Sequence, residues 1–267
     1  MYFTPVDAFS KAHKASTVDV TVIKIGGSCL ASHAELRKVA GRMALRIAAG
    51  EKLVLVVSAL KGVTDALLRE AGERGIRHPA DLDAHVAKGE AESAHLLAEE
   101  LCALGVRAEA VAPGKWSWPV VTDSNHGDAN PLIEETAARS EAKLKPLLET
   151  GVTPVVCGFV GVDEHGRVTT LGRGGSDATA LLLGRVLGAT QVVLLKDVDG
   201  FYSADPKKDS TARRLPHLTA KEALVLAENG AKVIQPKALQ LKAENVPLLV
   251  IGSESGVGTL ITGCVET

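Results

Sequence analysis

Short runs of Val, Ile and Leu alternate along this chain with longer segments whose apolar residues recur at helical spacing. This alternation is typical of a mostly parallel β-sheet covered by helices, so the sequence predicts an α/β fold. The expected strands are residues 18–25, 53–57, 106–111, 152–160, 191–195 and 247–251, with a hairpin tip at 163–166 and a last strand-like run at 258–262. The expected helices are residues 34–49, 65–73, 83–104, 131–149, 180–187, 221–231 and 236–244.

The length of the chain fits one large domain or two small ones. Of its 267 residues, 46% are apolar but only 3% are aromatic, so the core must be built from Val, Leu, Ile and Ala. No internal repeat, low-complexity tract or linker marks a domain boundary. If the chain has two lobes, the division falls near residues 175–190, where the style of the motifs changes.

Charge and composition disfavour several partners and locations. The net charge of −2 gives no basic surface for nucleic acid or for an anionic membrane. No apolar stretch reaches the roughly 18 residues that span a bilayer, and residues 1–17 lack the apolar centre of a secretory signal. The four cysteines are widely spaced, and the eight histidines show no metal-ligand spacing. We therefore expect a cytoplasmic protein with unpaired thiols and no structural metal.

The segment 170–179, with the sequence TLGRGGSDAT, lies between a predicted strand and a predicted helix. Glycines at such a junction let backbone N–H groups face a ligand, and the start of a helix adds the positive end of its dipole. A glycine-rich turn alone is ambiguous, because such turns are also ordinary connections. Arg173, which suits bidentate capture of a carboxylate or phosphate, favours a ligand site together with Ser176 and Asp177. Capping of the next helix by Ser176 or Asp177 is a second role compatible with the first.

Polar residues lie at the ends of four of the predicted strands. They are Lys24 with Gly26-Gly27-Ser28, Ser58, the loop 172–177 and the segment 197–200. Because ligands of open α/β sheets bind beyond the carboxyl ends of the strands, these positions are expected to share one site. A lone lysine at a strand end is ordinarily solvated, but the two glycines after Lys24 favour contact with a phosphoryl group. Neither the P-loop motif nor the Gly-x-Gly-x-x-Gly motif occurs.

Taken in order, six segments resemble the amino acid kinase family, and within it the catalytic domain of aspartate kinases. They are residues 23–28 (IKIGGS), 57–64 (VSALKGVT), 89–90 (GE), 170–179, 196–206 (KDVDGFYSADP) and 230–233 (GAKV). The glycine-rich segment 170–179 is the most specific part of this resemblance, which spans about residues 20–262. The resemblance implies a three-layer α/β/α sandwich around a mostly parallel sheet. It also implies an N-terminal extension, residues 1–17, before a single kinase domain, residues 18–267, whose acceptor-binding lobe ends near residue 180 and whose ATP-binding lobe follows.

The resemblance implies roles for individual residues of the acceptor lobe. Lys24 would stabilise the transferring phosphate, Asp177 would orient the active-site lysines, and Gly26, Gly27 and Ser28 would donate hydrogen bonds to the phosphates. The implied acceptor contacts are Ser58, Thr64, Glu90, Arg173, Gly174 and Ser176, of which Arg173 binds a carboxylate and Glu90 the α-ammonium. The alternative for Glu90 is a solvated position, since its helix is rich in charge. The family has Ser-His where this chain has Ala87-Lys88.

The implied nucleotide contacts lie in the second half of the chain. They are Lys196, Asp197, Tyr202, Lys207 and Lys232, with the first three near adenosine and Lys232 near the phosphates. The family commonly has Thr at the position of Lys196, Arg at that of Lys207 and His at that of Gln235. Lys207 keeps the positive charge of arginine but not its planar donor geometry.

The expected reaction is ATP-dependent phosphorylation of L-aspartate, or of a close analogue, to 4-phospho-L-aspartate. A side-chain carboxylate with a pKa of about 4 is ionised at neutral pH and needs no general base. Two lysines, a Gly-Gly loop, helix N-termini and Mg²⁺ carried by ATP would supply orientation and charge. The alternatives are a kinase for another small carboxylate and a nucleotide-binding or storage protein without turnover.

Two further expectations concern assembly and regulation. The resembling family usually forms dimers through its kinase domain, so a homodimer is expected. Many aspartate kinases also carry C-terminal ACT domains that bind lysine or threonine. Only residues 263–267 follow the last predicted strand, so we expect no such module and no feedback inhibition by either amino acid.

Overall fold

Eight strands form one sheet in a computed structural model that describes residues 19–265, with the predicted N-terminal extension, residues 1–17, outside the described range. Their order across the sheet is β3-β4-β2-β1-β7-β9-β10-β8, and every neighbouring pair is parallel except β9 and β10. The strands are β1 (Val20–Ile25), β2 (Lys52–Val57), β3 (Ala108–Val111), β4 (Thr153–Cys157), β7 (Gln191–Lys196), β8 (His217–Thr219), β9 (Leu248–Gly252) and β10 (Gly258–Thr262).

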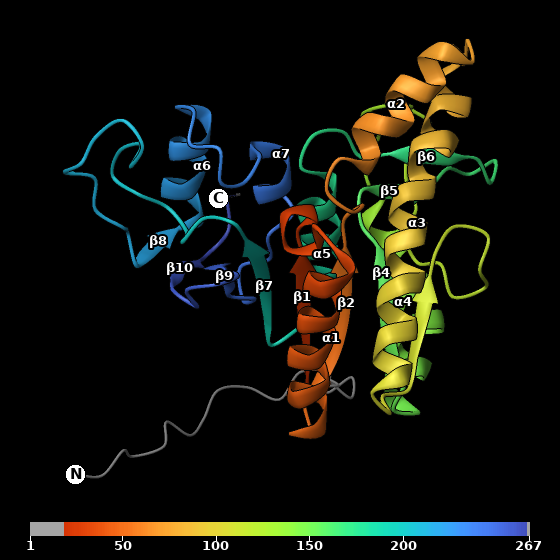
Figure 1. Ribbon diagram of the computed structural model, residues 1–267, viewed down its shortest axis with the longest axis horizontal. Coiled ribbons are helices and arrows are strands. Elements are labelled where there is room, and N and C mark those ends of the chain that lie inside the picture. Colours follow the sequence, from red (N-terminus) through yellow and green to blue (C-terminus); the bar gives the residue numbers. More distant parts are fainter. Residues whose placement is uncertain (1–18, 266–267) are drawn as a thin grey trace.

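Helices cover both faces of this sheet and give the predicted three-layer α/β/α arrangement (Figure 1). On one face α1 (His33–Ala48) packs against α3 (Pro79–Ala103), and α2 (Val63–Glu73) lies along α3. On the other face α4 (Ile133–Glu149) packs against α5 (Gly175–Val186), which also contacts α7 (Pro236–Leu239). The helix α6 (Ala220–Glu228) packs against α7, and β5 (Val160–Val162) pairs with β6 (Val168–Thr170) as a short hairpin.

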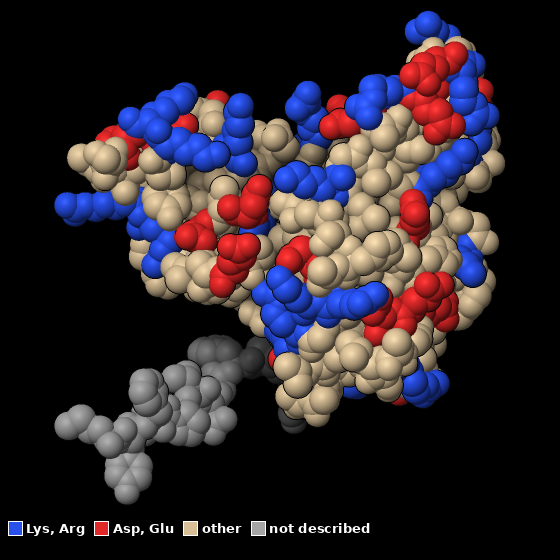
Figure 2. All heavy atoms as spheres, viewed as in Figure 1, with Lys and Arg blue, Asp and Glu red and all other residues tan. Residues whose placement is uncertain are grey.

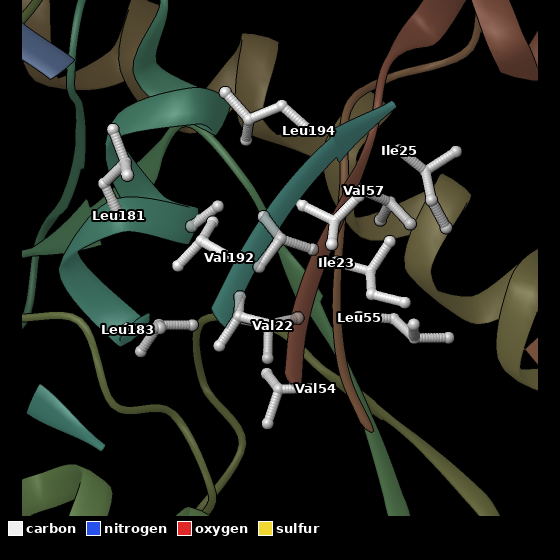
Figure 3. Close-up of a cluster of buried hydrophobic side chains, with 14 of the residues drawn as sticks. Val22, Ile23, Ile25, Val54, Leu55, Val57, Leu181, Leu183, Val192 and Leu194 are labelled. Atoms are coloured by element: carbon white, nitrogen blue, oxygen red, sulfur yellow. The ribbon is translucent and has the colours of Figure 1, made fainter. Parts of the chain in front are cut away.

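The central strands are apolar on both faces because both faces are covered. All six residues of β1 are buried. Side chains alternate along a strand, so Val22 and its register partners Val54 and Val192 share one face, while Ile23 and Leu55 share the other. Figure 3 shows the first set beside Leu181 and Leu183 of α5 and the second set on the opposite side of the sheet. Parallel strands buried in this way read as continuous apolar runs in the sequence.

Several predicted element boundaries were wrong. The strand expected over 152–160 divides into β4 and β5, because Phe159 takes a left-handed conformation with φ of 68°. The helix expected from residue 180 begins at Gly175, so the polar half of the glycine-rich segment belongs to its first turn. Its N-cap is Gly174, with φ of 75°, rather than Ser176 or Asp177. The last predicted helix ends at Leu239 instead of residue 244, and strand β8 was not predicted.

Candidate active site

The predicted acceptor residues meet at one edge of the sheet. The carboxyl ends of β1, β2 and β7 and the first turn of α5 surround a cavity of about 350 Å³ there. It is lined by Lys24, Ser58, Thr64, Glu90, Phe159, Gly172, Arg173, Gly174, Gly175, Ser176, Asp177 and Lys196. Figure 2 shows lysine and arginine side chains on both sides of a notch at this edge of the molecule. The site therefore lies where the strand-end pattern of the sequence predicts it.

Asp177 lies between two lysines at the base of the cavity. Its Oδ1 is 3.0 Å from Lys24 Nζ, and its Oδ2 accepts a hydrogen bond of 2.6 Å from Lys196 Nζ. Burial raises the pKa of the Asp177 carboxyl group, but the two ammonium groups outweigh burial and hold that pKa below its usual range. Burial lowers the pKa of Lys196, and the charge of Asp177 opposes that change. One ionised carboxylate thus holds two lysines in place.

The glycine-rich loop is confined between two other segments. A Cβ atom at Gly172 would lie 2.4 Å from Asp128 Oδ1, and one at Gly174 would lie 2.6 Å from Gln235 Cγ. Both residues also have positive φ angles, of 73° and 75°, which glycine adopts without strain. A larger residue at either position would adopt a strained conformation and would displace the side chain of Asp128 or Gln235, so the exposed Arg173 lies in a loop that requires both glycines.

Glu90 lies in the middle of α3 and only 4% of its surface is exposed. Burial raises the pKa of this carboxyl group to about 8, although the backbone N–H of Ala59 and the charge of Lys24 oppose the shift. Its Oε2 has no hydrogen-bond partner within the described residues. A buried carboxyl group with a free oxygen on a cavity wall suits a cationic ligand, and the solvated alternative for Glu90 is excluded.

Asp83 lies two turns before Glu90 on α3, and its carboxylate holds the start of the glycine-rich loop. Its Oδ1 accepts a hydrogen bond of 2.7 Å from Thr170 Oγ1, and its Oδ2 accepts from the backbone N–H of Thr170 at 3.1 Å. The same Oδ2 accepts bonds of 3.0 Å from His126 Nδ1 and from the backbone N–H of Gly127. One buried carboxylate therefore holds both the strand that enters the glycine-rich loop and the loop 123–130 beside it.

Lys237 of α7 connects the loop 123–130 to the second half of the chain. Its Nζ donates hydrogen bonds to Asp128 Oδ1 at 2.6 Å, to the Asp128 carbonyl oxygen at 3.1 Å and to the Ala129 carbonyl oxygen at 3.0 Å. Gly172 lies against Asp128, and Gly174 lies against Gln235 at the start of α7. The hydrogen bonds of Lys237 therefore connect the two segments that flank the glycine-rich loop.

The remaining predicted site residues lie outside the lining of this cavity. Gly26 and Gly27 follow β1 directly, and a Cβ atom at Gly27 would lie 2.6 Å from the Ala59 carbonyl oxygen. The side chain of Ser28 is exposed on the short 3-10 helix η1 (Gly27–Leu30). The predicted nucleotide contacts Asp197, Tyr202, Lys207 and Lys232 lie on loops of the second half, where all but Tyr202 are exposed. Lys196 alone among the predicted nucleotide residues lines the cavity.

Sequence reasoning missed Phe159, Asp83, Asp128 and Lys237. A strand-end position next to Gly158 was a signal for Phe159 that could have been used. The other three contact partners distant in sequence, at separations of 87 residues for Asp83 and Thr170 and 109 for Lys237 and Asp128. No local pattern marks such pairs.

A larger depression, of about 690 Å³, lies elsewhere and is a weaker candidate. Its walls come from the segment 113–118, from α4 and from the β5–β6 hairpin, and Lys143 Nζ lies 5.1 Å from the centre of the Trp116 ring. None of the predicted site residues lines it. The smaller cavity is preferred because charged groups with shifted pKa values converge there.

The described residues offer little to a protein-bound metal ion. Between residues 19 and 265 no group of three or more His, Cys, Asp and Glu side chains is arranged to hold one. Asp177, the ionised carboxylate of the cavity, is already paired with two lysines. Over the same range, no helix combines the length and the apolar character needed to cross a membrane.

A profile of the amino acid kinase family matches residues 19–252, and the chain belongs to this family. It is 37% identical over 246 residues to an aspartate kinase of Pseudomonas putida, a match that covers 90% of this chain and 58% of the relative. It is 38% identical over 251 residues to an aspartokinase of Corynebacterium efficiens, covering 92% of this chain and 58% of the relative. The chain thus spans somewhat more than half the length of these curated relatives.

Solved structures agree on the fold. Aspartokinase III of E. coli, in complex with aspartate and ADP, superposes with a TM-score of 0.81 at 29% identity, over 93% of this chain and 65% of that one. An isopentenyl phosphate kinase, 22% identical, gives a TM-score of 0.61 over 91% of this chain and 100% of that one, and it shares the fold alone. The α/β fold with its eight-stranded, mostly parallel sheet is that of aspartokinase structures.

Proposed function

We propose that this protein transfers the terminal phosphoryl group of ATP to the side-chain carboxylate of L-aspartate, forming 4-phospho-L-aspartate and ADP. The observation that carries the proposal is the cavity in which Lys24, Asp177 and Lys196 lie together with Arg173 and Glu90. The similarity to aspartate kinases, and the aspartate and ADP bound by E. coli aspartokinase III, support the same reaction.

The charges of the cavity match those of an amino-dicarboxylate. Glu90 carries the free Oε2 that would receive the ammonium group of the acceptor. Arg173, held by the glycines on either side, would bind one carboxylate through two parallel hydrogen bonds. Hydroxyl groups of Ser58, Thr64 and Ser176 line the same cavity and would complete the acceptor site. The other carboxylate is then left to face the lysines.

The chemistry requires charge compensation rather than proton transfer. An oxygen of the acceptor carboxylate forms a bond to the terminal phosphorus of ATP, and the bond between that phosphorus and the bridging oxygen breaks, leaving its electron pair on ADP. Both reactants are anions, so the main barrier that the protein can lower is their repulsion. Lys24, held by Asp177, would stabilise the phosphoryl group in flight.

The nucleotide would lie on the second half of the chain. Asp197, Tyr202, Lys207 and Lys232 remain the proposed contacts, with the backbone of Gly26 and Gly27 and the Ser28 hydroxyl near the phosphates. Mg²⁺ would be bound chiefly by the phosphates of ATP, because the described residues supply no set of three metal ligands. No step of the proposed reaction is assigned to the ion.

A hydroxamate-trapping assay tests the proposal. Purified protein is incubated with ATP, Mg²⁺, hydroxylamine and one acceptor from a panel that includes L-aspartate, L-glutamate and N-acetylated aspartate. We expect aspartyl hydroxamate with L-aspartate, and little product with the N-acetylated form, which lacks the ammonium group that Glu90 would bind. Product with another carboxylate and none with aspartate would overturn the substrate. ATP binding by calorimetry without ADP formation for any acceptor would favour a non-catalytic protein.

A further inference from the structure

We propose that Lys196 is a second catalytic cation, which contacts the transferring phosphoryl group together with Lys24 instead of contacting adenosine. This inference deepens the proposed function and rests on it. Three independent features of the site support it, which are the strand register, the balance of charge in the cavity and the position of the other nucleotide residues.

The register of the sheet directs both lysines to the same place. Strands β1 and β7 are parallel neighbours, and Lys24 is the register partner of Leu194. Lys196 lies two residues beyond Leu194, and side chains repeat every second residue along a strand, so Lys196 and Lys24 project from the same face. Helix α5 covers that face and presents Asp177 to both. The register of the sheet therefore sets the face from which both lysines project.

The charges of the cavity leave one positive charge without a partner on the acceptor. Five ionisable side chains line it, namely Lys24, Glu90, Arg173, Asp177 and Lys196. In the acceptor complex Glu90 would pair with the ammonium group and Arg173 with one carboxylate. Lys24 and Lys196 together carry two positive charges and Asp177 carries one negative charge. The one net positive charge faces the two reacting anions, which is where a phosphoryl-transfer site requires it.

Lys196 is not needed to neutralise Asp177. A single ammonium group at 3.0 Å, that of Lys24, already provides a partner for this carboxylate. Keeping a second lysine with only 15% of its side chain exposed is unfavourable, since burial lowers its pKa and the nearby charge of Lys24 lowers it further. A buried excess charge of this kind points to an anionic ligand at the same position.

The position of Lys196 also argues against contact with adenosine. Asp197, the next residue, lies in the bend that follows β7 and is exposed. Tyr202 forms a bridge with Arg214 farther along the connection, and neither Tyr202 nor Lys207 lines the cavity. Lys196 instead shares the cavity with the residues that would bind the acceptor. A cation there would face the carboxylate that the proposed reaction phosphorylates.

In the proposed step Lys196 donates a hydrogen bond to a non-bridging oxygen of the phosphoryl group as the new bond forms and the bond to ADP breaks. No proton is transferred, and two ammonium groups stabilise the negative charge of the phosphoryl oxygens. Removing the charge should therefore slow turnover and leave binding of ADP nearly unchanged.

The test compares Lys196→Met, which keeps length without charge, with Lys196→Arg and with the control Lys115→Met, an exposed lysine of the other depression. We expect kcat of Lys196→Met to fall about 100- to 1000-fold, as for loss of one charge-stabilising donor. Its affinity for ADP should stay within about threefold of the wild-type value, and its affinity for ADP with tetrafluoroaluminate, a mimic of the phosphoryl group in flight, should fall as kcat does. Lys196→Arg should recover part of kcat, and Lys115→Met should match the wild type.

Other outcomes overturn the proposal. A weaker affinity for ADP with unchanged kcat at saturating ATP would assign Lys196 to the adenosine site, and no change in either would make the contact with Asp177 purely structural. If Lys196→Met does not fold, acylation of lysines in the wild-type protein, read by mass spectrometry, gives the answer. Lys196 should be protected by ADP with tetrafluoroaluminate beyond any protection by ADP alone, and equal protection by both would overturn the proposal.

The same experiments separate this inference from the proposed function. Wild-type turnover is measured first with the acceptor panel, and the ratio of variant to wild type is taken with whichever carboxylate is phosphorylated. If aspartate is not the acceptor, the proposed substrate fails while the ratio still decides the role of Lys196. If no acceptor is phosphorylated, the proposed function fails and lysine protection decides the role of Lys196.

Discussion

Asp177 and Glu90 are both buried carboxyl groups on the wall of one cavity, yet their pKa values move in opposite directions. Asp177 touches two ammonium groups, which stabilise its ionised form more than burial destabilises it. Glu90 has only the Ala59 N–H and the nearby charge of Lys24 to oppose burial, and its pKa rises to about 8. The protonation of each residue follows from its partners, so the free protein has a mainly neutral Glu90 at pH 7.

Glu90 should make the stability of the protein depend on pH. Its pKa of about 8 in the folded state lies above the ordinary value of 4.5, so between these values the folded state keeps a proton that the unfolded state has lost. The contribution of Glu90 to stability is therefore complete below the ordinary value and is lost as pH rises towards 8. Glu90→Gln does not titrate. We expect the unfolding free energy of the wild type, relative to this variant, to fall by up to about 1.4 kcal/mol per pH unit.

Urea denaturation of both proteins at pH 5, 6, 7 and 8 measures this difference. Glu92→Gln, at an exposed position on the same helix, is the matched control and should follow the wild-type profile. A difference between wild type and Glu90→Gln that stays constant from pH 5 to pH 8 would show that burial does not shift the Glu90 carboxyl group.

At the scale of elements, the glycine-rich loop is positioned by segments that come from both halves of the chain. Helix α3 holds β6, the strand that leads into the loop, through Asp83. Helix α7 holds the neighbouring loop 123–130 through Lys237. Gly172 lies against Asp128 of the loop 123–130, and Gly174 lies against Gln235, the N-cap of α7. The location of Arg173 therefore depends on contacts that lie outside the loop itself.

Lys237→Met should weaken acceptor binding more than it weakens the fold. The variant loses three hydrogen bonds that connect α7 to Asp128 and Ala129, but both charged partners are partly exposed, so the loss of stability should be at most about 1 kcal/mol. We expect KM for the acceptor to rise several-fold with kcat at saturation changed less, and Lys237→Arg to restore part of the affinity. Lys145→Met, which removes a surface ion pair on α4, is the control. An unchanged KM together with lower stability would limit Lys237 to a structural role.

The sequence predicted the elements better than their ends. Residues 192–195 of β7 are all apolar and buried, because both faces of the central sheet are covered, so such a run in the sequence indicates a strand directly. The start of α5 was misplaced because Gly174 and Gly175 do not favour helix, and here the left-handed Gly174 caps a helix whose first turn is held by Lys24 and Lys196. Strand β8 was missed because it has only three residues, and its pairing with β10 is tertiary.

Some residues of the candidate site could be predicted from local sequence patterns, and others could not because their contacts are distant in sequence. Lys24, Ser58 and the loop 172–177 were predicted together because each lies at or after the end of a predicted strand. In the structure the loop follows β6, which belongs to the two-stranded sheet and not to the eight-stranded one. Lys196 was assigned to the adenosine contacts by the family resemblance of segment 196–206, whereas the two-residue period of β7 places it on the same face as Lys24. Asp83 and Lys237 could not be predicted, because their partners are fixed only when distant segments pack.

At the scale of the whole molecule, one core connects the two halves. The apolar residues of β1 and β2 and those of β7 and α5 belong to a single buried cluster. Strands β1 and β7, which come from different halves, are paired along five residues of each. The ligand cavity lies at the end of this shared pair, so its geometry depends on the packing of α5 against both strands. We infer that the described part of the chain unfolds as one unit.

Gly184→Ala tests this cooperativity. A Cβ atom at Gly184, in α5, would lie 2.2 Å from Val192 Cγ2 in β7, so either the buried Val192 side chain or the helix must shift. We expect a loss of about 1–3 kcal/mol of unfolding free energy, as for overpacking in other cores. The urea transitions followed by far-ultraviolet circular dichroism and by tryptophan fluorescence should move together, although the buried Trp118 lies in the other half of the chain.

Gly41→Ala is the matched control for this substitution. Gly41 also lies inside a helix, but a Cβ atom there meets nothing within 4 Å, so the variant should be more stable by about 0.5–1 kcal/mol through its lower backbone entropy when unfolded. A fluorescence transition that stays in place while the dichroism transition of Gly184→Ala moves would mean that the two halves unfold separately. In that case the pairing of β1 with β7 would not couple them, and ligands in the cavity would stabilise each half to a different extent.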